Sequence, residues 1–223
     1  MLKIVVMAIV GVVIGWFVPI LAQKLIDYKS MKNNRTYEEH WWTLKKWCGI
    51  TCVVFSAGGL GYCGYLNPSW IVLILVGIIW LLGMVTIVVD LRIRIIANEM
   101  ILAFIPLAII FRIVLDGPRS VLNSIFTMVI VMTACIILGK IMGLWKVGAG
   151  DVKLFGVIGL MYGFPNIVYP VLVTAGAIII YVLGGFKLYK ITMKTMFAMA
   201  PFIVAGMLIG IPLILQYGTA NLL

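Results

Sequence analysis

Acidic residues and long polar stretches are scarce in this sequence. Only 7 of its 223 residues are Asp or Glu, and charged residues make up 11% of the chain, against about 25% in a typical soluble domain. Hydrophobic residues make up 64%, and the mean hydropathy is +1.21. These deficits exclude an ordinary soluble domain. They predict a polytopic membrane protein with one transmembrane domain, residues 1–223, and no separate soluble domain.

Cysteine pairs with metal-binding spacing are also missing. The four cysteines, Cys48, Cys52, Cys63 and Cys135, lie in or beside apolar runs, and none of them forms a CxxC pair. Two thiols and the distant His40 do not make a zinc site. We therefore interpret the cysteines as small packing residues of a membrane bundle and expect no bound metal.

Apolar runs near the ~20 residues that cross a bilayer as a helix recur along the chain. They lack the period-two alternation of barrel strands. The sequence therefore predicts an all-α, polytopic membrane helical bundle of about eight transmembrane helices, at residues 4–21, 47–66, 70–89, 100–115, 120–139, 152–163, 167–185 and 197–216. The sixth span is short and contains Gly156, Gly159 and Gly163, so we expect a tilted or partial helix there.

The net charge of +10 is divided unevenly between the two sides of the predicted membrane. If residues 22–46 form a short basic cytoplasmic loop, that side holds 14 of the 17 Lys and Arg residues, and both termini are external. The exceptions are Lys3, Arg119 and Arg112, and Arg112 lies within a span where it can pair with Asp116. This distribution predicts contact with anionic membrane lipids. It does not predict nucleic-acid binding, because no basic soluble face with interleaved aromatics is present.

Three of the acidic residues, Asp90, Glu99 and Asp151, are not explained as solvated or turn residues. Asp90 follows the third apolar run, and Asp151 stands between residues 148–150 (Gly-Ala-Gly) and the sixth run, so both are expected at the cytoplasmic edge of the membrane. Two neighbouring carboxylates share a proton, as aspartic proteases require. Spacing alone leaves structural alternatives open: interfacial helix caps, or Asp151 as the N-cap of the sixth helix.

Three segments resemble the prepilin peptidases, the type IV leader peptidases of the GxGD aspartyl protease class. They are DLRIRIIAN (residues 90–98), GAGDVKL (residues 148–154) and MAPFIVAG (residues 199–206). The resemblance implies that Asp90 and Asp151 are the catalytic pair of a membrane-embedded aspartic endopeptidase. The implied reaction removes the leader peptide of type IV prepilin or pseudopilin proteins at the cytoplasmic face of the cell membrane.

The same resemblance implies roles for further residues. Gly148 and Gly150 are expected to shape the site around the second aspartate, because glycine lets a substrate backbone approach closely. Lys153 occupies the family's lysine position, as electrostatic or lipid-facing support, although an interfacial snorkelling lysine is an equal alternative. Asn98 ends the first motif and is expected to bind substrate or shape the site. The third and sixth spans must then be neighbours at their cytoplasmic ends.

Two departures from the family pattern bear on the expected chemistry. Ala97 stands where a proline is expected before Asn98, which predicts a less rigid stop after the first aspartate. The basic loop, residues 22–46, lacks the two CxxC pairs with which many members bind zinc. Bifunctional members also methylate the new N-terminus with S-adenosylmethionine, but a short loop without zinc ligands favours peptidase activity alone. Water and two carboxylates suffice for that activity, so no cofactor is expected.

Two functions of other classes stay open on the sequence. A small ion- or proton-coupled transporter also uses intramembrane acids. Proton relays usually place those acids near mid-bilayer with polar companions, however, whereas these spans are almost uniformly apolar. An inactive assembly subunit is the second alternative, and only the presence of both aspartates argues against it.

Overall fold

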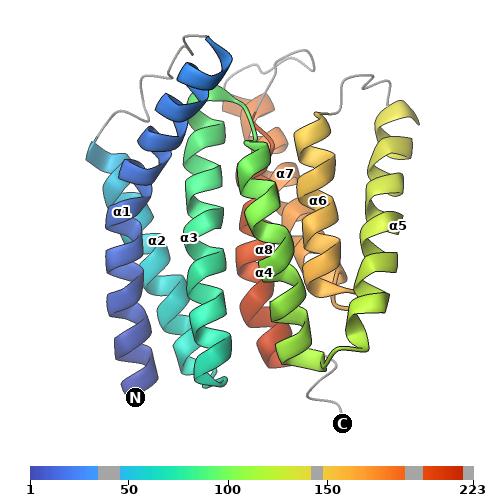
Figure 1. The fold of residues 1–223 in the computed structure, drawn as a ribbon. Coiled ribbons are helices and arrows are strands. Elements are labelled where there is room, and N and C mark those ends of the chain that lie inside the picture. The colour runs from blue at the N-terminus through green and yellow to red at the C-terminus, as the bar shows by residue number, and fades with distance from the viewer. Residues whose placement is uncertain (35–45, 142–147, 189–197, 218–223) are drawn as a thin grey trace.

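Figure 1 shows the computed structural model of the chain, a bundle of long helices. The structure describes residues 1–34, 46–141, 148–188 and 198–217. Within these ranges it contains helices and turns but no strand, so the predicted all-α class is confirmed. The helices are α1 (Leu2–Asn33), α2 (Lys46–Tyr65), α3 (Trp70–Ile93), α4 (Asn98–Asp116), α5 (Ser120–Ile141), α6 (Ala149–Tyr162), α7 (Val168–Leu188) and α8 (Ala200–Tyr217).

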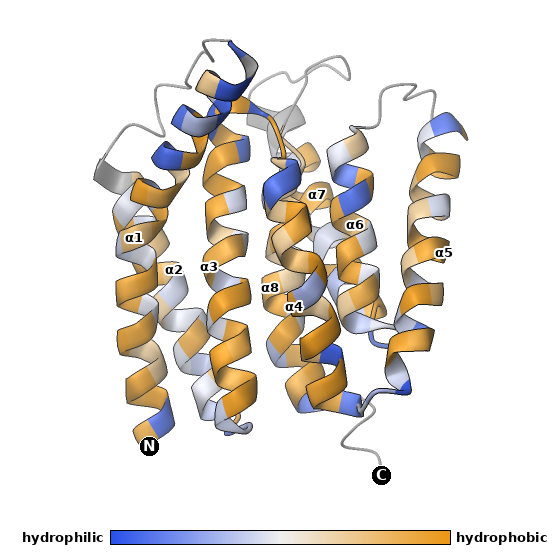
Figure 2. Cartoon of the chain, viewed as in Figure 1, coloured by the Kyte–Doolittle hydropathy of each residue, from blue (hydrophilic) through white to orange (hydrophobic). Residues whose placement is uncertain are grey.

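Six of the described helices, α1 to α5 and α8, are long and apolar enough to cross a membrane. Their surfaces are apolar along most of their length, and polar residues gather toward the ends (Figure 2). α6 has 14 residues, or about 21 Å of helix, and the described apolar part of α7 is Val168–Gly184. The chain is therefore a multi-pass membrane protein, and α6 is the short helix that the sequence predicts.

The first helix differs most from its predicted boundaries. Part of the loop predicted at residues 22–46 is helical, because α1 continues to Asn33. A helix of 32 residues is ~48 Å long, well beyond the ~30 Å hydrocarbon core of a bilayer. Ala22 and Ile26 are buried on the inner face of this extension, which explains why helix persists there. Residues 35–45 of the predicted loop lie outside the described part of the chain.

Two glycines allow α1 to pack closely against α2. A Cβ on Gly11 would lie 2.6 Å from the Cα of Ala57, and a Cβ on Gly15 would lie 2.6 Å from the backbone nitrogen of Val53. Gly11 and Gly15 are four residues apart and share one face of α1, the small-residue spacing that lets helix backbones approach in membranes. The contact between these helices therefore depends on the absence of both side chains.

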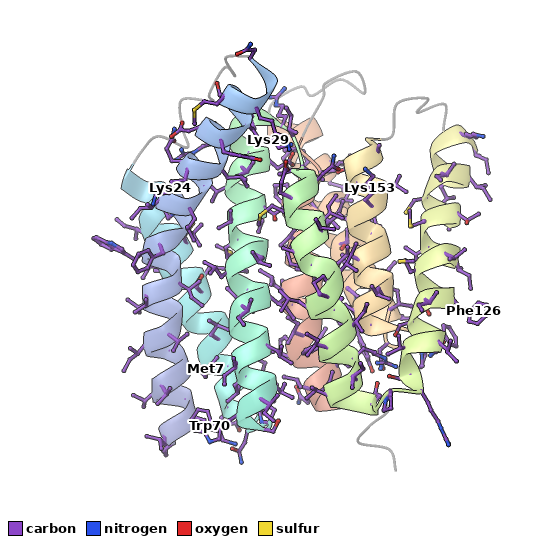
Figure 3. The ribbon with its side chains drawn as sticks, in the orientation of Figure 1. Met7, Lys24, Lys29, Trp70, Phe126 and Lys153 are labelled. Atoms are coloured by element: carbon purple, nitrogen blue, oxygen red, sulfur yellow. The ribbon has the colours of Figure 1, made fainter. Side chains whose placement is uncertain are left out.

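α4 and α8 fill the space between α3 and α6, and each packs against both of them (Figure 1). α3 ends and α6 begins at the same end of the bundle, which we call the aspartate end because Asp90 and Asp151 lie there. Most of the described basic residues belong to this end: Lys24, Lys29, Lys32, Arg92, Arg94, Lys140 and Lys153. Figure 3 labels three of these lysines, with Trp70 at the opposite end.

Arg112, the basic residue predicted within a span, is buried among the helices. Only 3% of its surface is exposed, and it forms an ion pair with Asp116, as the spacing of four residues predicts. The hydroxyl of Ser120, the first residue of α5, donates a hydrogen bond of 2.6 Å to the carbonyl oxygen of Gly117 and lies 3.4 Å from the carbonyl oxygen of Arg112. This polar cluster joins α4 to α5 near the end of the bundle opposite the aspartates.

We expect Gly15→Leu to weaken the packing of α1 on α2, because its side chain would meet the backbone of α2. The thermal unfolding midpoint of the purified protein in detergent should fall by an amount that corresponds to about 1–3 kcal/mol. Gly58→Leu is the matched control, since nothing lies within 4 Å of a Cβ at Gly58. Equal midpoints for the two variants would contradict this description of the α1–α2 contact.

Candidate functional site

Asp90 lies in the last turn of α3 and is buried, with 4% of its surface exposed. Its Oδ2 accepts a hydrogen bond of 3.1 Å from the backbone N–H of Ala200, the first residue of α8. The first N–H groups of a helix have no acceptor within the helix, and the helix dipole favours negative charge at this point. α8 therefore supplies Asp90 with both a fixed donor and a favourable electrostatic field.

The chain turns sharply after Asp90. Arg94 adopts a left-handed conformation with φ 52°, and its N–H donates a hydrogen bond of 2.8 Å to the carbonyl oxygen of Asp90, which ends α3. Ala97 is the N-cap of α4 and has φ −69°, close to the value that proline imposes. It is buried, with 1% exposed. The backbone thus adopts a proline-like angle at this position without proline.

Asp151 lies in the first turn of α6 and is partly exposed. The N-cap of α6 is Gly148, so the alternative that Asp151 caps this helix is wrong. A Cβ on Gly148 would lie 2.6 Å from Oδ2 of Asp151, and a Cβ on Gly150 would lie 3.0 Å from the Cβ of Ile96. Glycine at these two positions leaves room for the Asp151 carboxylate and lets α6 approach the segment that follows Asp90.

The structure places the two carboxylates at the same end of the bundle. Neighbouring carboxylates repel each other when both are ionised. α3 and α6 make few direct contacts with each other, unlike the neighbours that the sequence predicts, because α4 and α8 lie between them and pack against both. Asp90 also caps α8, as one of the structural alternatives predicts, because it accepts the hydrogen bond from the backbone N–H of Ala200. Capping α8 needs only one carboxylate, however, so this role does not explain the presence of Asp151 at the same end.

Lys153 and Asn98 meet at the edge of this site. The Nζ of Lys153 donates a hydrogen bond of 3.1 Å to Oδ1 of Asn98, and both side chains are exposed. The bond joins the first turn of α6 to the first residue of α4. A snorkelling lysine needs no such partner. The contact therefore favours the supporting role that the resemblance implies for Lys153.

Several contacts at the aspartate end cannot be predicted from the sequence. Arg92 is 6% exposed and donates a hydrogen bond to Oε1 of Gln23 on α1. Glu99, in the first turn of α4, is bound by Lys32 at 3.1 Å and by Lys29 at 3.5 Å. The scarcity of acids singles out Glu99, but the sequence predicts a loop where α1 continues and so gives no sign of these partners.

Two of the cysteines contribute packing within the bundle. Cys52 and Cys63 are buried, as predicted for packing residues, with 4% and 0% of their surfaces exposed. Among the residues that the structure describes, no three His, Cys, Asp or Glu side chains come together as metal ligands. His40 lies outside these residues.

Comparison with models of protein families matches residues 75–215 to the type IV leader peptidase family. The match covers more than half of the chain and includes Asp90, Asp151 and the first residue of α8. Searches of curated proteins and of solved structures gave no match.

The bond between Asp90 and Ala200 leads to a prediction about stability. In Asp90→Asn the side-chain oxygen can still accept this bond, whereas in Asp90→Leu the buried N–H loses its acceptor. We expect the leucine variant to be less stable than the asparagine variant by about 1–3 kcal/mol, measured by thermal unfolding in detergent.

The same two substitutions at Asp151 provide the control. No described residue donates a hydrogen bond to the Asp151 carboxylate, so its leucine and asparagine variants should differ less in midpoint. A difference as large at Asp151 as at Asp90 would show that the Ala200 bond is not the cause.

Proposed function

Because the chain belongs to the type IV leader peptidase family, we propose that it is a membrane-embedded aspartic endopeptidase whose catalytic pair is Asp90 and Asp151. The observation that carries this proposal is the position of the two carboxylates at the same end of the bundle, with Asp90 in the last turn of α3 and Asp151 in the first turn of α6. The carboxylates come from different helices, α3 and α6, and both lie within the residues that the family model matches.

The proposed reaction is hydrolysis of a peptide bond. Of two close carboxylates one keeps a proton, because the ionisation of both is costly. The ionised carboxylate takes a proton from water as the water oxygen attacks the peptide carbonyl, and the protonated carboxylate donates its proton to the carbonyl oxygen. Proton transfer to the leaving nitrogen then accompanies cleavage of the C–N bond. This scheme uses no metal and no other cofactor.

The surroundings of the pair support this role. Asp90 is buried and fixed by the N–H of Ala200, whereas Asp151 is partly exposed. Gly148 leaves room for the Asp151 carboxylate and Gly150 lets α6 approach Ile96, so both glycines shape the site around the second aspartate. Lys153 and Asn98 hold the starts of α6 and α4 together next to the second carboxylate.

The proposed substrate is a type IV prepilin or pseudopilin, a small membrane protein with a short basic leader followed by a hydrophobic helix. The basic residues of the aspartate end favour a cytoplasmic location for the site in the cell membrane. These residues do not attract a basic leader directly. They hold the site against anionic lipid, which also gathers the leader, and the substrate helix enters the same membrane beside the enzyme.

We expect cleavage without methylation of the new N-terminus. The chain has no CxxC pair in residues 22–46, and the bifunctional members of the family carry such pairs there. If the cleaved product were methylated when S-adenosylmethionine is supplied, its mass would increase by one methyl group, and this part of the proposal would be wrong.

The proposed pair predicts that Asp90→Asn and Asp151→Asn each abolish cleavage, because asparagine keeps the size of aspartate but cannot exchange the proton. We expect activity to fall by at least ~1,000-fold in each single variant. The measurement is cleavage of a co-expressed prepilin-like substrate, followed by mobility shift and by the mass of the product.

Asp27→Asn is the matched control, since Asp27 is an exposed carboxylate at the same end and the asparagine oxygen can still accept the hydrogen bond that Gln23 donates. This variant should cleave like the wild type. Normal cleavage by either variant of the pair, at equal levels of inserted protein, would show that the assignment is wrong.

Gly148→Ala should impair the same reaction, because its methyl group would lie 2.6 Å from Oδ2 of Asp151 and displace that carboxylate. A shift of about 1 Å in a catalytic group lowers the rate by about 10- to 100-fold. The readout is the initial rate of leader cleavage. Gly77→Ala on α3 is the control, since nothing lies within 4 Å of a Cβ there; similar losses in both variants would rule out this explanation.

A further inference from the structure

We propose that the end of α1 beyond the membrane is a positioning brace for the aspartate pair, which acts through the contacts of Glu99 with Lys29 and Lys32 and of Arg92 with Gln23. The inference rests on the proposed function, since it assigns these side chains a role in the same reaction. They are positioning residues, because none of them touches the reacting atoms.

The first contact of the brace holds the end of α3. Arg92 follows Asp90 by two residues and is 6% exposed, and it donates a hydrogen bond to Oε1 of Gln23. The amide of Gln23 is itself oriented, because its Nε2 donates a hydrogen bond of 3.0 Å to Oδ1 of Asp27, one turn further along α1. The turn of α3 that carries Asp90 is thereby attached to α1.

The second contact holds the start of α4. Glu99 lies 3.5 Å from Lys29 and 3.1 Å from Lys32, both on the extension of α1. The side chain of Lys29 is only 11% exposed and that of Glu99 34% exposed. Ion pairs between fully exposed side chains are worth little, but this pair is shielded on the Lys29 side and joins helices far apart in the sequence.

A third contact continues the chain of polar groups to the other carboxylate. Asn98, next to Glu99, accepts the hydrogen bond of Lys153, which follows Asp151 by two residues. The first turn of α4 is therefore held from one side by α1 and from the other by α6, and Figure 3 labels Lys29 and Lys153 on either side of it. Each aspartate is thus followed two residues later by a basic residue that is hydrogen-bonded to another helix: Arg92 to α1 and Lys153 to α4.

The segment between the two holding points needs such restraint. Residues 94–97 form neither helix nor strand, yet they connect the helix of Asp90 to α4, which packs against the helix of Asp151. The separation of the carboxylates therefore depends on where α4 begins. A shift of about 1 Å in a catalytic group is enough to lower the rate of a reaction. The brace is therefore important for turnover, although partly exposed ion pairs add little to the stability of the bundle.

The experiment compares leader cleavage by four purified proteins in detergent: wild type, Glu99→Gln, the charge swap Glu99→Lys with Lys29→Glu and Lys32→Glu, and Lys24→Met. We expect Glu99→Gln to lower kcat by about tenfold with KM within about twofold of wild type, because substrate binding is not disturbed. The swap, which rebuilds both ion pairs of Glu99 with reversed charges, should restore most of kcat. Lys24→Met should match the wild type, since Lys24 is exposed and takes no part in these contacts.

Hydrogen exchange of residues 94–99 provides a second readout that needs no substrate. Exchange should be faster in Glu99→Gln than in the wild type and should return toward the wild-type rate in the swap. An unchanged kcat in Glu99→Gln overturns the proposal. A lower kcat in Glu99→Gln that the swap does not restore, with hydrogen exchange of residues 94–99 equal to that of the wild type, also overturns the proposal.

Failure of the proposed function gives a different pattern. If the wild type cleaves no prepilin-like substrate, the peptidase assignment falls, and the exchange rates alone then decide whether α1 restrains residues 94–99. Equal exchange in wild type and Glu99→Gln overturns the brace in that case as well. Faster exchange in Glu99→Gln supports the restraint by α1 without the peptidase.

Discussion

Two carboxylates at the edge of a hydrocarbon core repel each other and lose hydration, so the protein must compensate each of them locally. Asp90 receives the first N–H of α8, a donor that exists at any helix start and needs no side chain. Asp151 instead keeps partial exposure and lies in the first turn of α6, where the helix dipole favours its charge. The groups that stabilise the two carboxylates belong to different helices, the start of α8 for Asp90 and the start of α6 for Asp151. The end of α3 must therefore meet the start of α8.

The arrangement of the bundle follows from that requirement. α4 and α8 lie between α3 and α6 and pack against both, so they set how close the two carboxylates come. α6 is short, and the glycines before Asp151 let its first turn approach Ile96 in the connection after α3. At the opposite end, the buried pair of Arg112 and Asp116 supports α4. The site is thus a property of helix ends, with an apolar core between them.

The sequence predicts the helical class, the order of the spans and the two aspartates, because apolar length and the scarcity of acids are visible in composition alone. It places α1 incorrectly. Residues after Leu21 are rich in lysine, which is typical of a loop in a membrane protein, yet buried Ala22 and Ile26 continue the helix. The donor to Asp90 is also hidden from sequence, since a backbone N–H has the same identity at every residue and only tertiary structure selects Ala200.

The contacts of the brace extend beyond the part of the chain that the family model matches, and this has a physical consequence. Asp90, Asp151 and Glu99 lie within residues 75–215, whereas the partners of Glu99 lie on α1, before that match begins. Substitutions on α1 can therefore change how tightly the start of α4 is held without altering any group that touches the substrate. Because the proposed reaction depends on the separation of two carboxylates, such changes would act on turnover through geometry.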